Sequence, residues 1–167
     1  MTATKEYAGK ILISVTDGKN LGEVKDVYFD PEASKMVAAH LGKSGLINRK
    51  SLLVDLSHVK LFGLDAWLVD ASDIVIAKDD APGTESYLIG DDLRGRDIQT
   101  DGGTKLGTVG DILVDEKHNV VGFALSKVQV QGPVAEAKTI ARAAITSLGN
   151  EKEPMIAVLE QAERLKV

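Results

Sequence analysis

Apolar residues recur along the chain with the period of β-strands. Val27 and Phe29 stand two positions apart, as do Ile112 and Val114. The same spacing continues through residues 36–41 and 120–125. Side chains two positions apart lie on one face of a strand, so these stretches predict short strands that bury one face. The pattern predicts an all-β protein.

One segment of this pattern occurs twice. LGEVKDVYFD at residues 21–30 returns as LGTVGDILVD at residues 106–115, and glycines that flank the two copies correspond as well, Gly9 with Gly95 and Gly63 with Gly149. Between the copies, AKDDAPGTESY at residues 77–87 combines acidic residues with Pro82 and Gly83, as a linker does. The sequence therefore predicts two units of about six short strands each, at residues 1–80 and 86–167.

The alternation slips by one residue at the same place in both copies. Val24 and Val27 are three positions apart, and so are Val109 and Ile112. A shift of this kind is typical of a β-bulge, which we expect at Lys25-Asp26 and Gly110-Asp111. Bulges bend strands, and small barrels need bent strands.

Two later stretches contain helix formers. Residues 135–145, AEAKTIARAAI, have helical composition, but alignment with the first copy favours a strand and a short turn, so both alternatives stay open. Residues 157–167, AVLEQAERLKV, carry glutamates early and a lysine late, and predict a short C-terminal helix.

Composition narrows the class of protein. The net charge of the 167 residues is -5 and the pI is near 5.2, which disfavours a general binder of nucleic acid. The chain holds no cysteine, so it has no disulfide, thiolate nucleophile or cysteine-ligated metal. It shows neither a signal peptide nor an apolar run long enough to insert into a membrane. We expect a cytoplasmic protein.

The repeated motif resembles the PRC-barrel family, which includes the cytoplasmic part of the photosynthetic reaction centre H subunit and the C-terminal domain of a bacterial ribosome maturation factor. The resemblance rests on LIGDDLRGRDI, a DG turn, LGTVGDILVD and a hairpin to VVGFAL, and it covers nearly the whole chain. It implies two tandem six-stranded β-barrels, which we expect to be related by approximate two-fold symmetry. It also implies a protein that binds other macromolecules and is not an enzyme.

Aspartates and glycines recur within the motif. These residues are Gly22, Asp26 and Asp30 in the first copy and Gly107, Asp111 and Asp115 in the second. Paired carboxylates could serve as metal ligands or acid–base groups. We favour structural roles, because a carboxylate at a bulge can accept hydrogen bonds from unpaired backbone amides and one at a strand end can cap the turn. A metal or acid–base site that the protein needs only once would not have to be present in both copies of the motif.

Candidate interaction residues lie in the first copy. Arg49 and Lys50 belong to a basic group in GKSGLINRKS, and Trp67 lies in the strand AWLV. We expect Trp67 in the core; if exposed, it would be the best anchor for a partner. His40, His58 and His118 show no metal-ligand spacing, and we expect no cofactor and no metal site.

The function predicted is a non-catalytic adaptor that binds a protein partner through barrel loops or a strand edge. One alternative is an RNA- or ribosome-associated factor, although no aromatic residue is interleaved with the basic ones to stack on bases. Another is a binder of a small molecule, metal or tetrapyrrole in a groove between the barrels. Partner, pathway and homo-oligomeric state stay open. We expect function to lie where the two copies differ.

Overall fold

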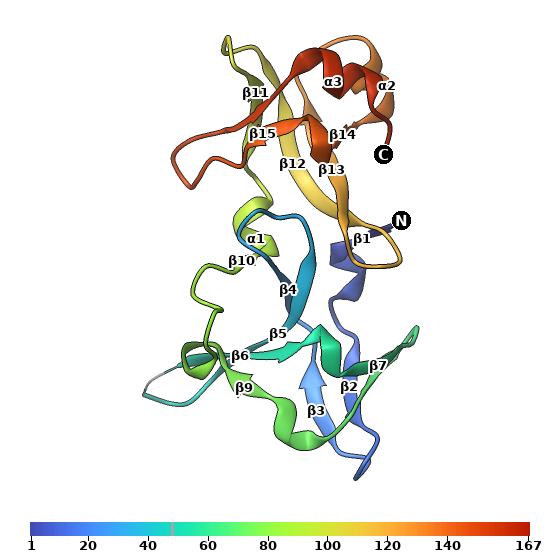
Figure 1. Ribbon diagram of the computed structural model, residues 1–167, viewed down its shortest axis with the longest axis vertical. Coiled ribbons are helices and arrows are strands. Elements are labelled where there is room, and N and C mark those ends of the chain that lie inside the picture. The colour runs from blue at the N-terminus through green and yellow to red at the C-terminus, as the bar shows by residue number, and fades with distance from the viewer. Residues whose placement is uncertain (48) are drawn as a thin grey trace. The chain divides into compact units, whose positions relative to one another are not determined.

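The computed structural model describes residues 1–47 and 49–167, and most of the residues in helices and strands belong to β-strands (Figure 1). The chain forms two compact units. The N-terminal unit holds Glu6–Pro31 and Val37–Ile89, and the C-terminal unit holds Gly90–Val167 together with Met1–Lys5 and Glu32–Met36. The units are therefore not simply the two continuous segments on either side of the linker, because residues 1–5 and 32–36 belong to the C-terminal unit.

The strands of the N-terminal unit form two sheets. One has the order β3-β2-β8-β7 and the other the order β10-β4-β5-β6-β9. Their bounds are β2 Ile11–Ser14, β3 Asn20–Glu23, β4 Asp26–Phe29, β5 Met36–Ser44, β6 Lys50–Asp55, β7 Val59–Phe62, β8 Ala66–Val69, β9 Ile76–Ala77 and β10 Leu88–Ile89. Apolar side chains on the inner faces, including Leu12, Phe29 and Trp67, are fully buried.

The C-terminal unit has one sheet of order β14-β13-β12-β11-β16-β15, to which β1 adds by pairing with β12. The strands are β1 Thr2–Ala3, β11 Asp97–Thr100, β12 Lys105–Val114, β13 Val120–Val128, β14 Thr139–Ala141, β15 Ile145–Ser147 and β16 Met155–Ala157. Three short helices accompany them, α1 Gly90–Leu93, α2 Pro133–Ala137 and α3 Leu159–Arg164. Ile98, Ile112, Phe123 and Met155 are buried.

The two repeats exchange their first strands. β1 begins the first repeat but pairs with β12 of the second, Thr2 opposite Val114. β10 occupies the corresponding position at the start of the second repeat and pairs with β4 of the first, Leu88 opposite Phe29. The sequence correspondence maps one pairing onto the other, so the exchange is reciprocal.

The turn between β4 and β5 also belongs to the C-terminal unit. Lys35 forms an antiparallel bridge with Asn119 in the turn between β12 and β13. The Met36 amide donates to the His118 carbonyl at 2.9 Å, and the Val120 amide donates to the Ser34 carbonyl at 2.8 Å. The two turns occupy corresponding positions in the repeats and satisfy each other's backbone groups.

The predicted irregularity in the repeated strand is present. In the second copy the register of β12 against β13 shifts between Val109 and Asp111, which confirms a bulge at Gly110. In the first copy the strand breaks between β3, which ends at Glu23, and β4, which begins at Asp26. The Lys25 amide in this break donates to the His40 carbonyl at 2.8 Å.

Other expectations hold in part. The C-terminal helix is confirmed as α3. Residues 135–145 contain both alternatives, since α2 ends at Ala137, Lys138 adopts a left-handed conformation with φ 55°, and β14 follows. The paired strands form open sheets, so two closed six-stranded barrels are not confirmed. Within the described ranges, no helix has the length and apolar character needed to cross a bilayer.

Candidate functional site

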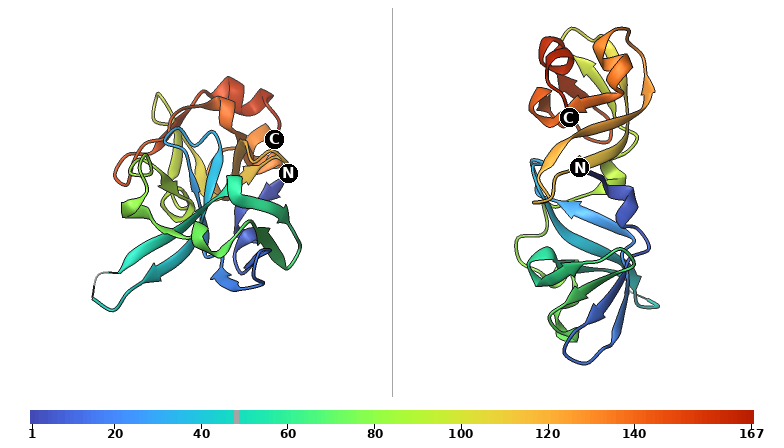
Figure 2. Two further views of the ribbon diagram at one scale, coloured as in Figure 1. Left: turned by 60° about the horizontal axis from the view of Figure 1, so that its bottom comes forward. Right: turned by 90° about the vertical axis from the view of Figure 1, so that its right-hand side faces the viewer.

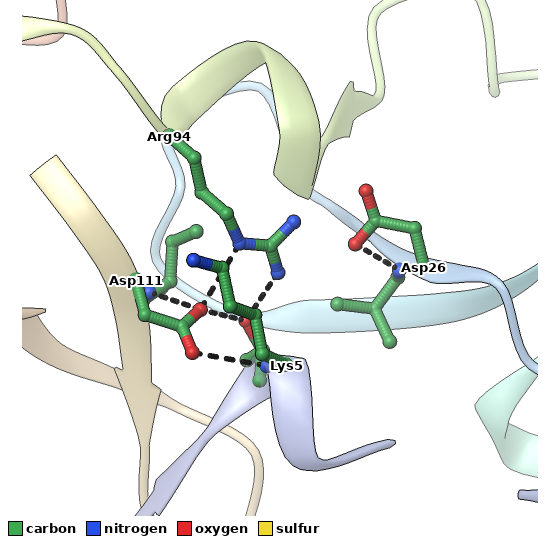
Figure 3. A network of polar contacts seen from close by, with 7 residues as sticks. Lys5, Asp26, Arg94 and Asp111 are labelled. Atoms are coloured by element: carbon green, nitrogen blue, oxygen red, sulfur yellow. Dashed lines mark hydrogen bonds and ion pairs between the residues drawn. The ribbon is translucent and has the colours of Figure 1, made fainter. Parts of the chain in front are cut away.

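Asp111 is the centre of a buried polar network in the C-terminal unit (Figure 3). Its Oδ1 accepts hydrogen bonds from Thr4 Oγ1 at 2.9 Å and from the Ile112 amide at 2.8 Å, while its Oδ2 accepts from the Lys5 amide at 3.0 Å. Arg94 Nε lies 3.1 Å from Oδ1, and the Arg94 guanidinium also donates to Thr4 Oγ1. The carboxylate thus joins β12 to the segment around β1 and to the end of α1.

The other three aspartates of the motif lie at strand ends. Asp26 accepts from the Val27 amide at 2.8 Å, as Asp111 does from Ile112 (Figure 3). Asp115 accepts from the amides of Lys117 and Asn119, both at 2.9 Å, and its hydrogen bond with the Asn119 side chain is the main cause that lowers its pKa. Asp30 directly follows β4 and precedes Pro31. These contacts favour the structural interpretation of the carboxylates.

The motif glycines serve two different needs. Gly22 has φ 115°, a conformation that L-residues rarely adopt, and open space surrounds the place where a Cβ would lie. At Gly107 the constraint is contact, because a Cβ would lie 2.3 Å from the Lys127 carbonyl oxygen on β13. Glycine is therefore needed for a different physical reason in each copy, the positive φ at Gly22 and the close contact with β13 at Gly107.

His40 and His118 are shielded from solvent enough to alter their titration. Burial is the main cause that lowers the pKa of His40 and of His118 below 6.5. His40 Nδ1 lies 2.8 Å from the hydroxyl of the buried Tyr28. His58 Nδ1 lies 3.4 Å from Asp70 Oδ2 at the surface. The imidazoles of His40 and His58 therefore have separate partners.

Charged residues line a cleft of about 490 Å³ in the C-terminal unit. It contains Arg94 and Arg96 together with Asp91, Asp92 and Glu153. Arg96 is already engaged, since it donates to the carbonyls of Asp92 and Leu148. Across residues 1–47 and 49–167, no three histidine, aspartate or glutamate side chains gather as metal ligands.

Trp67 lies in the core and not at the surface. Its side chain is 1% exposed and packs edge-on against Tyr7 and Phe62, with ring centroids 5.3 Å and 4.8 Å away. The suggestion that Trp67 could anchor an interface is therefore corrected, because β8 directs its side chain to the inner face of the sheet. The expectation that it belongs to the core is confirmed.

The basic candidates lie on the hairpin of β5 and β6. Arg49 and Lys50 are exposed, as is Lys43 on the facing strand. Lys50 Nζ lies 3.4 Å from Asp80 Oδ2. The expected basic segment GKSGLINRKS includes residue 48, which lies outside the described residues. The structure thus brings the three cations to one end of one hairpin.

A partly exposed apolar surface, absent from the sequence predictions, lies on strands β2, β8 and β7 of the sheet β3-β2-β8-β7, where Ile11 and Leu61 are exposed and Ile13 and Leu68 are half-buried. Ile13 lies opposite Leu68, and Leu68 lies opposite Leu61 on the edge strand β7. The intervening residues Leu12, Trp67 and Val69 are buried, so the outward side chains are Ile11, Ile13, Leu61 and Leu68. We call these four residues the apolar sheet face.

The C-terminal unit is polar at the corresponding positions. There β11 runs parallel to β16 as β2 runs parallel to β8. Register and repeat place Asp97, Gln99 and Ser147 where the apolar sheet face has Ile11, Ile13 and Leu61, and only Leu68 keeps an apolar counterpart, Ile156. A residue-by-residue comparison of the two copies could have revealed this contrast from sequence.

Comparison with known families agrees with the repeat. The model of the PRC-barrel domain matches residues 4–76 and again residues 87–140, so one match falls on each copy of the motif. No curated protein matches the chain. The matched segments cover most of the sequence, and the chain therefore belongs to the PRC-barrel domain family, with the module present in tandem.

Proposed function

We propose that this protein is a non-catalytic adaptor that binds a protein partner through the apolar sheet face of its N-terminal unit. The observation that carries the proposal is the contrast between corresponding sheets, one apolar and one polar on its outer face. Folding alone does not require the apolar residues, since the second copy forms the same strands with polar ones. Exposed apolar patches on a protein surface are typical of interaction sites.

The surroundings of this face suit a protein partner. Leu61 is 56% exposed on β7, which forms the edge of its sheet, and Leu64 in the following turn is 87% exposed. On the opposite side, Glu23 and Asn20 of β3 lie beside Ile11 and Ile13 and give the face a polar border. An apolar centre with a polar rim is the usual composition of a protein interface. In this proposal each unit is a rigid β-scaffold of the barrel type, which holds its surface side chains in fixed positions.

The test exchanges the face for the residues of the second copy. The triple variant Ile11→Asp, Ile13→Gln, Leu61→Ser carries side chains that the same fold accepts at the corresponding positions. Affinity capture with crosslinking from native cells should recover a partner at stoichiometric level with the original chain and at least about tenfold less with the triple variant. Ile76→Ser, on β9 of the other sheet, is the matched control, and it should capture normally.

Two outcomes would count against the proposal. Equal recovery by the original chain and the triple variant would exclude the apolar sheet face as the docking surface. Recovery of no stoichiometric partner by either chain would undermine the adaptor function itself. Circular dichroism and urea denaturation of the variants establish that loss of capture is not loss of folding.

A further inference from the structure

The hairpin of β5 and β6 ends in two aliphatic side chains that lie open to solvent. Leu46 is 103% exposed and Ile47 is 95% exposed. In Figures 1 and 2 the two strands run out together beyond the other strands of their unit. Both apolar side chains are thus held at the outermost end of a projecting element, where burial against the protein itself contributes nothing to folding.

Cations surround this tip. Lys43, Arg49 and Lys50 are all exposed, and we call these three residues the basic collar; the pairing of β5 with β6 places Lys43 opposite Ser51 and Ser44 opposite Lys50. Residues 33–54 contain no aspartate or glutamate, although the whole chain has a net charge of -5. Among the described ion pairs, the collar meets an acidic group at Asp80, beside Lys50. The tip is therefore locally positive on a negative protein.

We propose that this hairpin tip binds the surface of a membrane that contains anionic lipids. Leu46 and Ile47 enter the region between headgroups and acyl chains, and the basic collar remains at the level of the phosphate groups. Apolar residues flanked by lysine and arginine are the composition of segments that lie in a bilayer interface. The contact is peripheral and spans nothing. It is independent of the apolar sheet face, which lies on the other sheet of the unit.

The side chains favour lipid over nucleic acid as the occupant. RNA recognition would use the cations but would leave two aliphatic residues exposed, and no aromatic residue within residues 43–50 offers a surface for base stacking. A bilayer uses both components at once, because its interface accepts apolar side chains and its anionic headgroups attract the basic collar.

The experiment measures binding of the full chain to sonicated vesicles by co-sedimentation. Vesicles of phosphatidylcholine with about one-third phosphatidylserine, chosen to mimic an anionic leaflet, are compared with phosphatidylcholine alone. We expect binding to the anionic vesicles only, weakened when salt is raised from about 0.1 M to about 0.5 M. Leu46→Ser with Ile47→Ser should weaken binding at least about tenfold. Replacing Lys43, Arg49 or Lys50 by Gln should weaken it about fivefold for each charge removed.

A reporter variant locates the contact. Because Trp67 is buried, its emission gives a constant background, and the substitution Ile47→Trp should add an emission that shifts to the blue and is quenched by brominated lipid when anionic vesicles are added. Leu64→Ser, which removes a similarly exposed leucine from another turn, is the control and should bind as the original chain does.

Three results would overturn the proposal. The first is absence of binding to anionic vesicles at low salt, including the case in which the chain binds RNA instead. The second is binding that survives loss of Leu46 and Ile47, which would indicate electrostatic adsorption elsewhere. The third is an emission spectrum of the Ile47→Trp variant that anionic vesicles leave unchanged.

Discussion

Lys35 and Asn119 occupy the same position in the two repeats and form a β-bridge with each other. Arg142 holds the first of these turns in place, since its guanidinium donates to the carbonyls of Glu32 at 2.6 Å and of Ala33 at 3.1 Å. It also donates to the carbonyl of Ile145, so one side chain ties the turn to the C-terminal sheet.

We expect Arg142→Lys to loosen this turn, because a lysine cannot reach several carbonyls with a planar fork of donors. The loss of about 1.4 kcal/mol of local stability corresponds to about tenfold faster amide exchange at Met36 and Val120, the two amides that bond across the turns. Hydrogen exchange followed by NMR provides the measurement. Arg164→Lys, at an exposed position of α3, should leave these amides unchanged.

The Asp111 network predicts a large effect from a small substitution. Asp111→Asn replaces the carboxylate that pairs with Nε of the nearly buried Arg94 by a neutral amide, and removes an acceptor from Thr4 or Lys5. We expect a loss of about 3 kcal/mol in the free energy of unfolding. Asp115→Asn is the control at the turn after β12, since asparagine keeps one acceptor oxygen, and it should cost less than about 1 kcal/mol. Urea denaturation that gives equal losses for both variants would contradict the structural role of Asp111.

The motif glycines predict unequal penalties for the same substitution. Gly107→Ala forces a methyl group against the backbone of β13 and should cost about 3 kcal/mol. In Gly22→Ala the added methyl group meets no neighbouring atom, and only the positive φ is unfavourable for alanine. This substitution should cost about 1 to 2 kcal/mol. Thermal denaturation of the two variants compares these costs directly. A larger cost at Gly22 than at Gly107 would contradict the assignment of steric contact as the stronger constraint.

Stability should fall in mildly acidic solution. Burial lowers the pKa of His40 and of His118, so protonation favours the unfolded chain. Their contribution is fully present above about pH 6.5, the ordinary histidine value, and is lost as the pH falls through the folded values. The difference between the urea midpoints measured about one pH unit above and about one pH unit below that value should be smaller in His40→Gln and in His118→Asn than in the original chain. It should be smallest in the double variant. Asparagine is chosen at 118 because it tolerates the φ of 65° found there.

The strand exchange predicts that the two repeats remain together after the linker is cut. A protease site introduced at the exposed Gly83 places β10 and β4 on different fragments, and likewise β1 and β12, but leaves both pairings available between fragments. We expect residues 1–83 and 84–167 to co-elute in gel filtration after cleavage, and each fragment prepared alone to be less stable than the pair. Two folded monomers that elute separately would contradict a stabilising exchange.

The period of the strands, the bulge at Gly110 and the final helix could be predicted from sequence because these features depend on local patterns. The exchange of β1 and β10 could not, since two-residue strands carry no periodic signal and their partners lie far along the chain. The network at Asp111 was missed for the same reason: Thr4 and Arg94 have ordinary neighbours in sequence. Trp67 was placed correctly in the core by the alternation of AWLV.

The exchanged strands also determine when each strand pairing can form during synthesis of the chain. Residues 2 and 3 leave the ribosome about 110 residues before Val114, the end of the strand with which they pair. At roughly 5 to 20 residues per second, that strand arrives on the order of 5 to 20 s later. During this interval the nascent first repeat has an incomplete edge at β4, which β10 fills only once residues 88 and 89 have emerged. The newborn chain is therefore most vulnerable to aggregation or chaperone capture in the middle of its translation.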